Sequence, residues 1–176
     1  MAEAITVNRA PVLTLWGVVV AERLGYEPET ALTLGKCLAG LNAQRKGRML
    51  GIYGPPKTGE SAKGEKVGLG EDFWIELCGR GLPAKNTPDG IRAVVKEKPI
   101  DPASVRKYLD GKFGDDLEAA WQAMVELAGA FETERLGEVA YGLYEKFRPK
   151  IPPGRRGWGA KGLLDLNLIV SMAKKA

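Results

Sequence analysis

Apolar residues recur at helical spacing through most of residues 101–147, which favours a largely helical fold. Residues 115–131 and 136–147 each place their leucine, alanine and aromatic side chains on one face of a helix. Such faces must be buried, and the connection between the two segments is short. We therefore expect these two helices to pack against each other as a helical hairpin.

Further helix starts are marked by capping residues. Asp101 precedes Pro102 and the segment ends at Gly114, which predicts a helix between them. Thr87 and Pro88 repeat this pattern and predict another helix over about 87–97. Asp165 is expected to cap a last helix that runs to about residue 173.

The first fifty residues predict a pair of helices. A helix is predicted over 11–24, with Pro11 in its first turn and Gly25 after its end. Apolar residues occur on nearly all of its faces, so we expect the helix to be buried. A second helix is predicted from Pro28 to about Gly47.

One β-hairpin is expected, near residues 72–85. It comprises a strand over Phe73–Cys78, a Gly-Arg-Gly turn and a short return strand. Residues 54–70 contain five glycines and two prolines, which predicts a loop. The expected fold is mainly α: a compact multi-helix domain with one small β-hairpin and a long Gly/Pro-rich loop. A single domain over 1–176 is expected, with sub-lobes at 1–50, 51–98 and 99–176.

The stretch "GPPKTGES" at 54–61 has the glycine spacing of a phosphate-binding P-loop. Glu60, however, stands where the phosphate-binding lysine is required, and would repel phosphate. Gly64, Gly68 and Gly70 also disfavour the helix that a P-loop needs. We therefore interpret this segment as a connector and predict no nucleotide or other cofactor.

The composition disfavours catalysis. The chain has no histidine, and it contains neither a G-x-S-x-G motif nor metal-ligand spacing. We therefore predict no catalytic and no metal-binding residue, and these features disfavour an enzyme without deciding the question. Cys37 and Cys78 lie among apolar residues without a C-x-x-C partner, which predicts core packing in a reducing, cytoplasmic compartment. The apolar run at 11–21 is too short for a membrane span, so no membrane partner is expected.

Charge is distributed unevenly along the chain. Residues 36–66 hold seven basic and two acidic residues, and residues 146–161 hold six basic residues and no acid. Residues 101–145 hold ten acids and four bases. Both basic segments are rich in glycine, which lets a backbone approach a ligand closely, and the second contains a tryptophan able to stack on a base.

These features predict non-catalytic nucleic-acid binding, with a helix-turn-helix-like arrangement around "NAQRKGR" at 42–48 as one form of it. The alternative at 42–48 is an unbroken helix whose basic end complements the macrodipole. Trp158 could also anchor its loop to the core, and the arginines could pair with the acidic helices. The predicted contact residues are Arg45, Lys46, Arg48, Arg155, Arg156 and Trp158.

Two other functions stay open at this point. One is a protein-interaction or homo-oligomeric module, in which the acidic half of one copy meets the basic segments of another. The other is a small-metabolite enzyme that works without histidine. A deep pocket lined by carboxylates would favour the enzyme.

Overall fold

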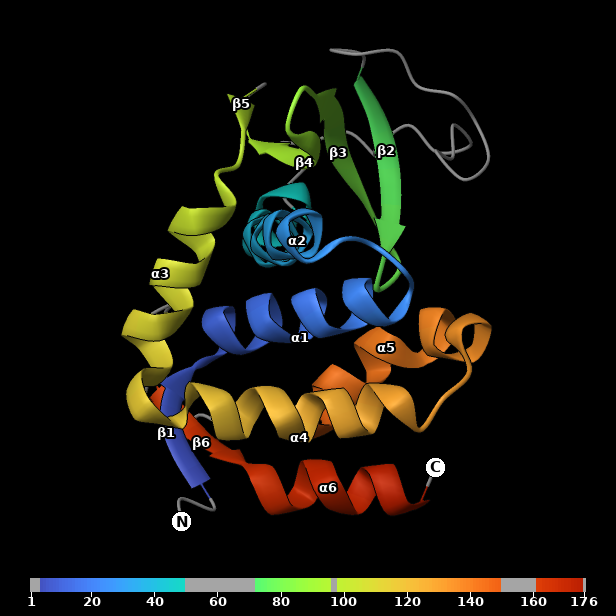
Figure 1. Cartoon of the computed structure of the whole chain (residues 1–176). Coiled ribbons are helices and arrows are strands. Elements are labelled where there is room, and N and C mark those ends of the chain that lie inside the picture. Colours follow the sequence, from blue (N-terminus) through green and yellow to red (C-terminus); the bar gives the residue numbers. More distant parts are fainter. Residues whose placement is uncertain (1–3, 50–71, 96–97, 150–160, 176) are drawn as a thin grey trace.

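The structure is a computed structural model, and it describes residues 4–49, 72–95, 98–149 and 161–175 (Figure 1). The loop predicted at 54–70 lies outside these ranges. The elements follow in the order β1 (Ala4–Asn8), α1 (Arg9–Arg23), α2 (Pro28–Met49), β2 (Asp72–Leu77), β3 (Arg80–Thr87), β4 (Gly90–Val95), β5 (Lys98–Pro99), α3 (Pro102–Phe113), the 3-10 turn η1 (Gly114–Asp116), α4 (Leu117–Gly129), α5 (Thr133–Phe147), β6 (Lys161–Asp165) and α6 (Leu166–Lys175).

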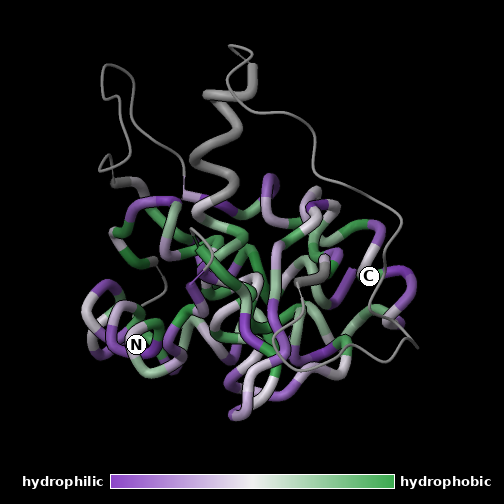
Figure 2. Tube along the Cα trace, turned by 90° about the horizontal axis from the view of Figure 1, so that it is seen from above, coloured by the Kyte–Doolittle hydropathy of each residue, from purple (hydrophilic) through white to green (hydrophobic). Residues whose placement is uncertain are grey.

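Helix α1 is the centre of the fold. It lies between α2 and α4, and the sheet of β2–β5 lies beyond α2 (Figure 1). Every residue from Pro11 to Ala21 is buried, as the apolar sequence predicts. The Trp16 indole nitrogen donates to the Ala140 carbonyl oxygen at 2.9 Å, and its ring meets the Phe147 ring edge-on with 5.2 Å between centroids. Figure 2 shows hydrophobic residues gathered in the interior of the trace.

Helices α1 and α2 approach each other closely because two glycines face each other. A Cβ on Gly17 would lie 2.9 Å from the Gly35 Cα, and a Cβ on Gly35 would collide with the Thr14 carbonyl oxygen. The helices cross steeply, since Figure 1 shows α2 along its axis and α1 from the side. Gly17 therefore enables a helix contact, although glycine itself weakens a helix.

The prediction of one small β-hairpin is wrong, although the fold is mostly helical. Strands β2, β3, β4 and β5 form a four-stranded antiparallel sheet in that order. The predicted hairpin is its β2–β3 pair, which turns at Cys78 and Gly79; their φ values of 51° and 75° suit a two-residue hairpin turn.

The helix predicted at 87–97 is strand β4. Thr87 pairs with Gly90 across a turn formed by Pro88 and Asp89, and Gly90 has a φ of 124°. A Pro-Asp-Gly sequence favours such a turn, and the following β-branched residues suit a strand.

A second sheet was not predicted. Strand β1 pairs antiparallel with β6, from Ala4 opposite Asp165 to Asn8 opposite Lys161. Ile5, Val7 and Leu164 are buried there, whereas Thr6 and Leu163 are exposed. The alternation of buried and exposed residues is that of a half-buried strand.

The predicted helices α3 to α6 are confirmed, but their packing differs from the prediction. The Asp101 carboxylate accepts from the Ala103 amide at 3.1 Å, and α3 ends at Gly114. The Asp165 carboxylate caps α6 in the same way, at 3.0 Å from the Asn167 amide. The expected α4–α5 hairpin is wrong, because α4 packs mainly against α1 and α6 while α5 packs against α1.

Candidate functional site

The first group of predicted contact residues lies at the end of α2. Arg45, Lys46 and Arg48 are in its last turns, and the helix runs unbroken from Pro28 to Met49. Gly40 therefore does not separate two helices, and the unbroken-helix alternative is confirmed for the backbone. The second group, Arg155, Arg156 and Trp158, lies outside the described residues.

The pair α1–α2 does not present a recognition helix in the manner of a helix-turn-helix protein. In such proteins the first residues of the second helix contact base edges in the major groove. Here Thr30, Ala31, Thr33 and Leu34 of α2 are all buried. The Thr33 hydroxyl accepts from the Ala93 amide of β4 at 3.0 Å, so the sheet covers this part of α2.

A basic cluster that the sequence did not predict lies where α2 meets α3. The Lys36 ammonium nitrogen is 3.6 Å from the centroid of the Tyr108 ring, and the Lys112 ammonium nitrogen is 5.9 Å from the same centroid. Lys36 is partly buried and Lys112 is exposed. In the part of the chain that the structure describes, neither lysine is within ion-pair distance of a carboxylate.

Burial and charge both act on Lys36. Desolvation lowers the pKa of the Lys36 ammonium, and the positive charge of Lys112 lowers that pKa further. The pKa of the Tyr108 hydroxyl is raised by burial, an effect that the Thr14 hydroxyl partly offsets. One sequence signal could have drawn attention to the cluster, since Lys36 is the single charged residue between Thr30 and Gln44.

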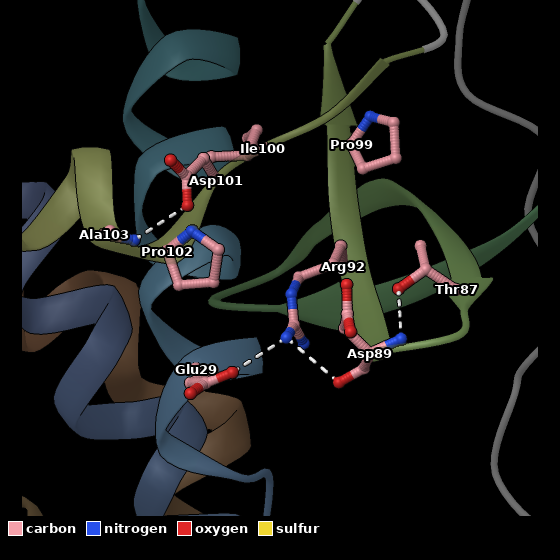
Figure 3. Close-up of a pocket in the computed structure, with 9 residues that line it drawn as sticks. All are labelled: Glu29, Thr87, Asp89, Arg92, Pro99, Ile100, Asp101, Pro102 and Ala103. Carbon is pink, nitrogen blue, oxygen red and sulfur yellow. Dashed lines mark hydrogen bonds and ion pairs between the residues drawn. The ribbon is translucent and has the colours of Figure 1, made fainter.

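A cavity of about 550 Å³ lies between the starts of α2 and α3 and the β3–β4 turn (Figure 3). The Arg92 side chain is only 6% exposed, and its Nη2 donates to the Glu29 carboxylate at 2.8 Å and to the Asp89 carbonyl oxygen at 3.0 Å. Its Nη1 donates to the Ile91 carbonyl oxygen at 2.9 Å. Arg92 thus links the β3–β4 turn to the start of α2 through these hydrogen bonds.

This cavity is lined by the carboxylates of Glu29, Asp89 and Asp101, as the enzyme hypothesis requires. Two of them already have structural partners, because Glu29 pairs with Arg92 and Asp101 caps α3. In general acid–base catalysis a positioned side chain transfers a proton to or from the substrate, whereas Glu29 and Asp101 hold the start of α2 and the start of α3 in place. Within the described ranges no group of acidic and cysteine side chains could hold a metal ion.

A smaller cavity of about 260 Å³ lies between β2 and α5 and reaches Cys78, Glu76, Glu134 and Glu138. Both cysteines are free thiols, and both are buried as predicted. Burial raises the pKa of Cys78 and of Cys37 to about 12, so both thiols are protonated at neutral pH. Because the thiolate is the reactive form, neither cysteine is suited to be a nucleophile.

The basic segments do not use the acidic helices as partners where both are described. Lys36, Lys146 and Arg148 form no ion pair with a carboxylate of the described ranges. The described ion pairs of the acidic half are internal, Arg106 with Asp110 and Arg135 with Glu138.

Comparison of the chain with known protein families, characterised proteins and solved structures gives no match. Among the described helices, none has the length and apolar character required to cross a bilayer.

Proposed function

We propose that the protein binds nucleic acid without catalysis, through the basic end of α2 and the basic segment at 155–158. The supporting observation is the charge of α2. From Thr30 to Met49 this helix carries Lys36, Arg45, Lys46 and Arg48 and no acidic residue. A continuous stretch of helix without acidic residues offers several cations to one phosphate backbone, and phosphate contacts are the main source of affinity for nucleic acid.

Single-stranded nucleic acid is the ligand that fits best. The buried start of α2 removes the usual route to major-groove reading of a duplex. Phosphate contacts from Arg45, Lys46 and Arg48 require no groove, and Trp158 beside Arg155 and Arg156 would supply a stacking surface for an unpaired base. Binding of this kind is tolerant of sequence and sensitive to salt.

The test is the salt dependence of binding to fluorescently labelled single-stranded RNA, single-stranded DNA and duplex DNA, followed by anisotropy. We expect affinity to fall steeply between about 50 mM and about 200 mM salt. The variant Arg45→Gln/Lys46→Gln/Arg48→Gln should reduce the slope of log K against log salt by about 2 for a single strand, if each residue contacts one phosphate.

The matched control is Lys98→Gln/Lys174→Gln/Lys175→Gln, which removes the same charge from exposed positions on β5 and at the end of α6. It should leave the slope unchanged. If the wild-type protein does not bind at low salt, or if both triple variants lose affinity equally, the proposal is wrong. Salt-sensitive self-association without nucleic acid, seen by light scattering, would instead support the homo-oligomeric module.

A further inference from the structure

Two lysines converge on one tyrosine at the contact between α2 and α3. The Lys36 ammonium lies at 3.6 Å from the centroid of the Tyr108 ring, a distance at which the negative ring face attracts the cation. Lys112, one turn further along α3, directs its ammonium to the same ring at 5.9 Å. The positive charge of Lys112 acts unfavourably on the Lys36 ammonium, so an anion bound at the cluster would relieve this repulsion.

The hydrogen-bonding capacity of these groups is incompletely used. A lysine ammonium has three N–H donors and no acceptor. Among the described residues, the contacts of Lys36 and Lys112 are those with the Tyr108 ring. Within this part of the chain their N–H donors are therefore not used by a carboxylate, and an oxyanion would accept charge-assisted hydrogen bonds from them.

We propose that Lys36 and Lys112, positioned by Tyr108, form a subsite for a phosphate group, and that this phosphate belongs to the backbone of the bound nucleic acid. The second half of this statement rests on the proposed function. Tyr108 is a positioning residue here, because its ring holds the Lys36 ammonium in place at the α2–α3 contact.

The position of the subsite on α2 suits a shared ligand. An α-helix rises about 1.5 Å per residue, so Lys36 and Lys46 are about 15 Å apart along the helix axis. A strand stacked as in a duplex advances about 3.4 Å per nucleotide, so this distance corresponds to about four stacked nucleotides and to fewer in a more extended single strand. A short strand could therefore contact the subsite and the end of α2 together.

The competing explanation is packing alone. Lysine stems often lie along apolar surface and place the charge in water, with no ligand involved. In that case Lys36 would stabilise the α2–α3 contact but would not respond to phosphate. The experiment therefore needs a direct readout of the Lys36 ammonium as well as an affinity.

The first arm follows the pKa of Lys36 by NMR of the lysine side chains, with inorganic phosphate as the probe. Phosphate should raise the pKa of Lys36, because a bound anion stabilises the charged ammonium. In the variant Lys112→Gln the response to phosphate should be lost, and the pKa of Lys36 in the free protein should rise because a neighbouring positive charge is gone. A pKa of Lys36 that phosphate leaves unchanged would overturn the subsite.

The second arm measures nucleic-acid affinity with Lys36→Gln and with the control Lys107→Gln, an exposed lysine next to Tyr108. We expect Lys36→Gln to weaken binding about tenfold or more, as for a lost hydrogen bond to a charged group. Lys107→Gln should bind as the wild-type protein does. Equal affinities of the two variants, each confirmed to be folded by circular dichroism, would also overturn the subsite.

The two arms separate this inference from the proposed function. If nucleic acid binds and Lys36 does not respond, the proposed function stands and the subsite is wrong. If inorganic phosphate shifts the pKa of Lys36 but no nucleic acid binds, the phosphate chemistry is supported and its assignment to a nucleic acid is wrong. The variant Arg45→Gln/Lys46→Gln/Arg48→Gln should keep the phosphate response while losing affinity for nucleic acid.

Discussion

Replacing Gly35 by alanine should destabilise the protein although alanine is the better helix former. A Cβ on Gly35 would collide with the Thr14 carbonyl oxygen and lie 2.9 Å from the Val18 amide nitrogen. Both atoms belong to the backbone of α1, which is buried on all sides and cannot easily shift. Relief therefore requires movement of the whole helix.

The magnitude follows from two opposing effects. Overpacking a core costs about 1–3 kcal/mol, and we expect the upper end because the contact is with backbone. Alanine in place of glycine within a helix stabilises by about 1 kcal/mol. The free energy of unfolding should thus fall by about 2 kcal/mol, which lowers Tm by about 4–8 °C for a chain of this size.

Gly40→Ala is the matched control on the same helix. Gly40 is exposed, and a Cβ there would meet no atom within 4 Å. The free energy of unfolding of this variant should rise by about 1 kcal/mol, because alanine has a higher helix propensity than glycine and makes no new close contact here. The measurement is urea unfolding followed by circular dichroism. Gly35→Ala and Gly40→Ala of equal stability would refute the close contact between α1 and α2.

Two further predictions concern the helix caps and the thiols. Asp101→Ala and Asp165→Ala should each lower the free energy of unfolding by about 0.5–2 kcal/mol, because each removes a carboxylate that accepts a hydrogen bond from a helix amide. The control in the same urea assay is Asp115→Ala, because no cap hydrogen bond to the Asp115 carboxylate is described. The pKa of Cys37 and of Cys78 is about 12 in the folded protein against 9.0 for the free thiol, so the unfolded state loses these protons first. Stability should therefore fall as pH rises from about 9 to about 12, and less so in Cys37→Ala/Cys78→Ala; identical pH profiles of the two proteins would contradict the burial.

Local signals in the sequence predict where most of the helices begin. The starts of α1, α2 and α3 follow from proline in the first turn and from Asp101 as a cap, and glycine follows the ends of α1 and α3. The predicted end of α2 at Gly47 is wrong, because the helix continues through this glycine to Met49. These signals work because they act within a few residues of the chain. The same reasoning failed at Thr87 and Pro88, because a residue that caps a helix can equally begin a β-turn, and Gly90 with its positive φ decides for the turn.

Contacts between distant segments could not be predicted in the same way. Strand β1 pairs with β6, which lies more than 150 residues later in the chain. Nothing in the sequence of either strand indicates which segment it pairs with. The Lys36–Tyr108–Lys112 cluster likewise depends on how α2 packs against α3, which periodicity alone does not give. The nucleic-acid contacts are predicted from the distribution of charge along the sequence, and that hypothesis stays a prediction.

The pairing of β1 with β6 also sets an order of events during synthesis. The two strands are separated by nearly the whole described chain. At about 5–20 residues per second, the ribosome needs roughly 8–30 s after making β1 to complete its partner. During that time the strand that contains Ile5 and Val7 lacks its pairing partner, so the β1–β6 sheet can form only after the strands of the β2–β5 sheet have been made.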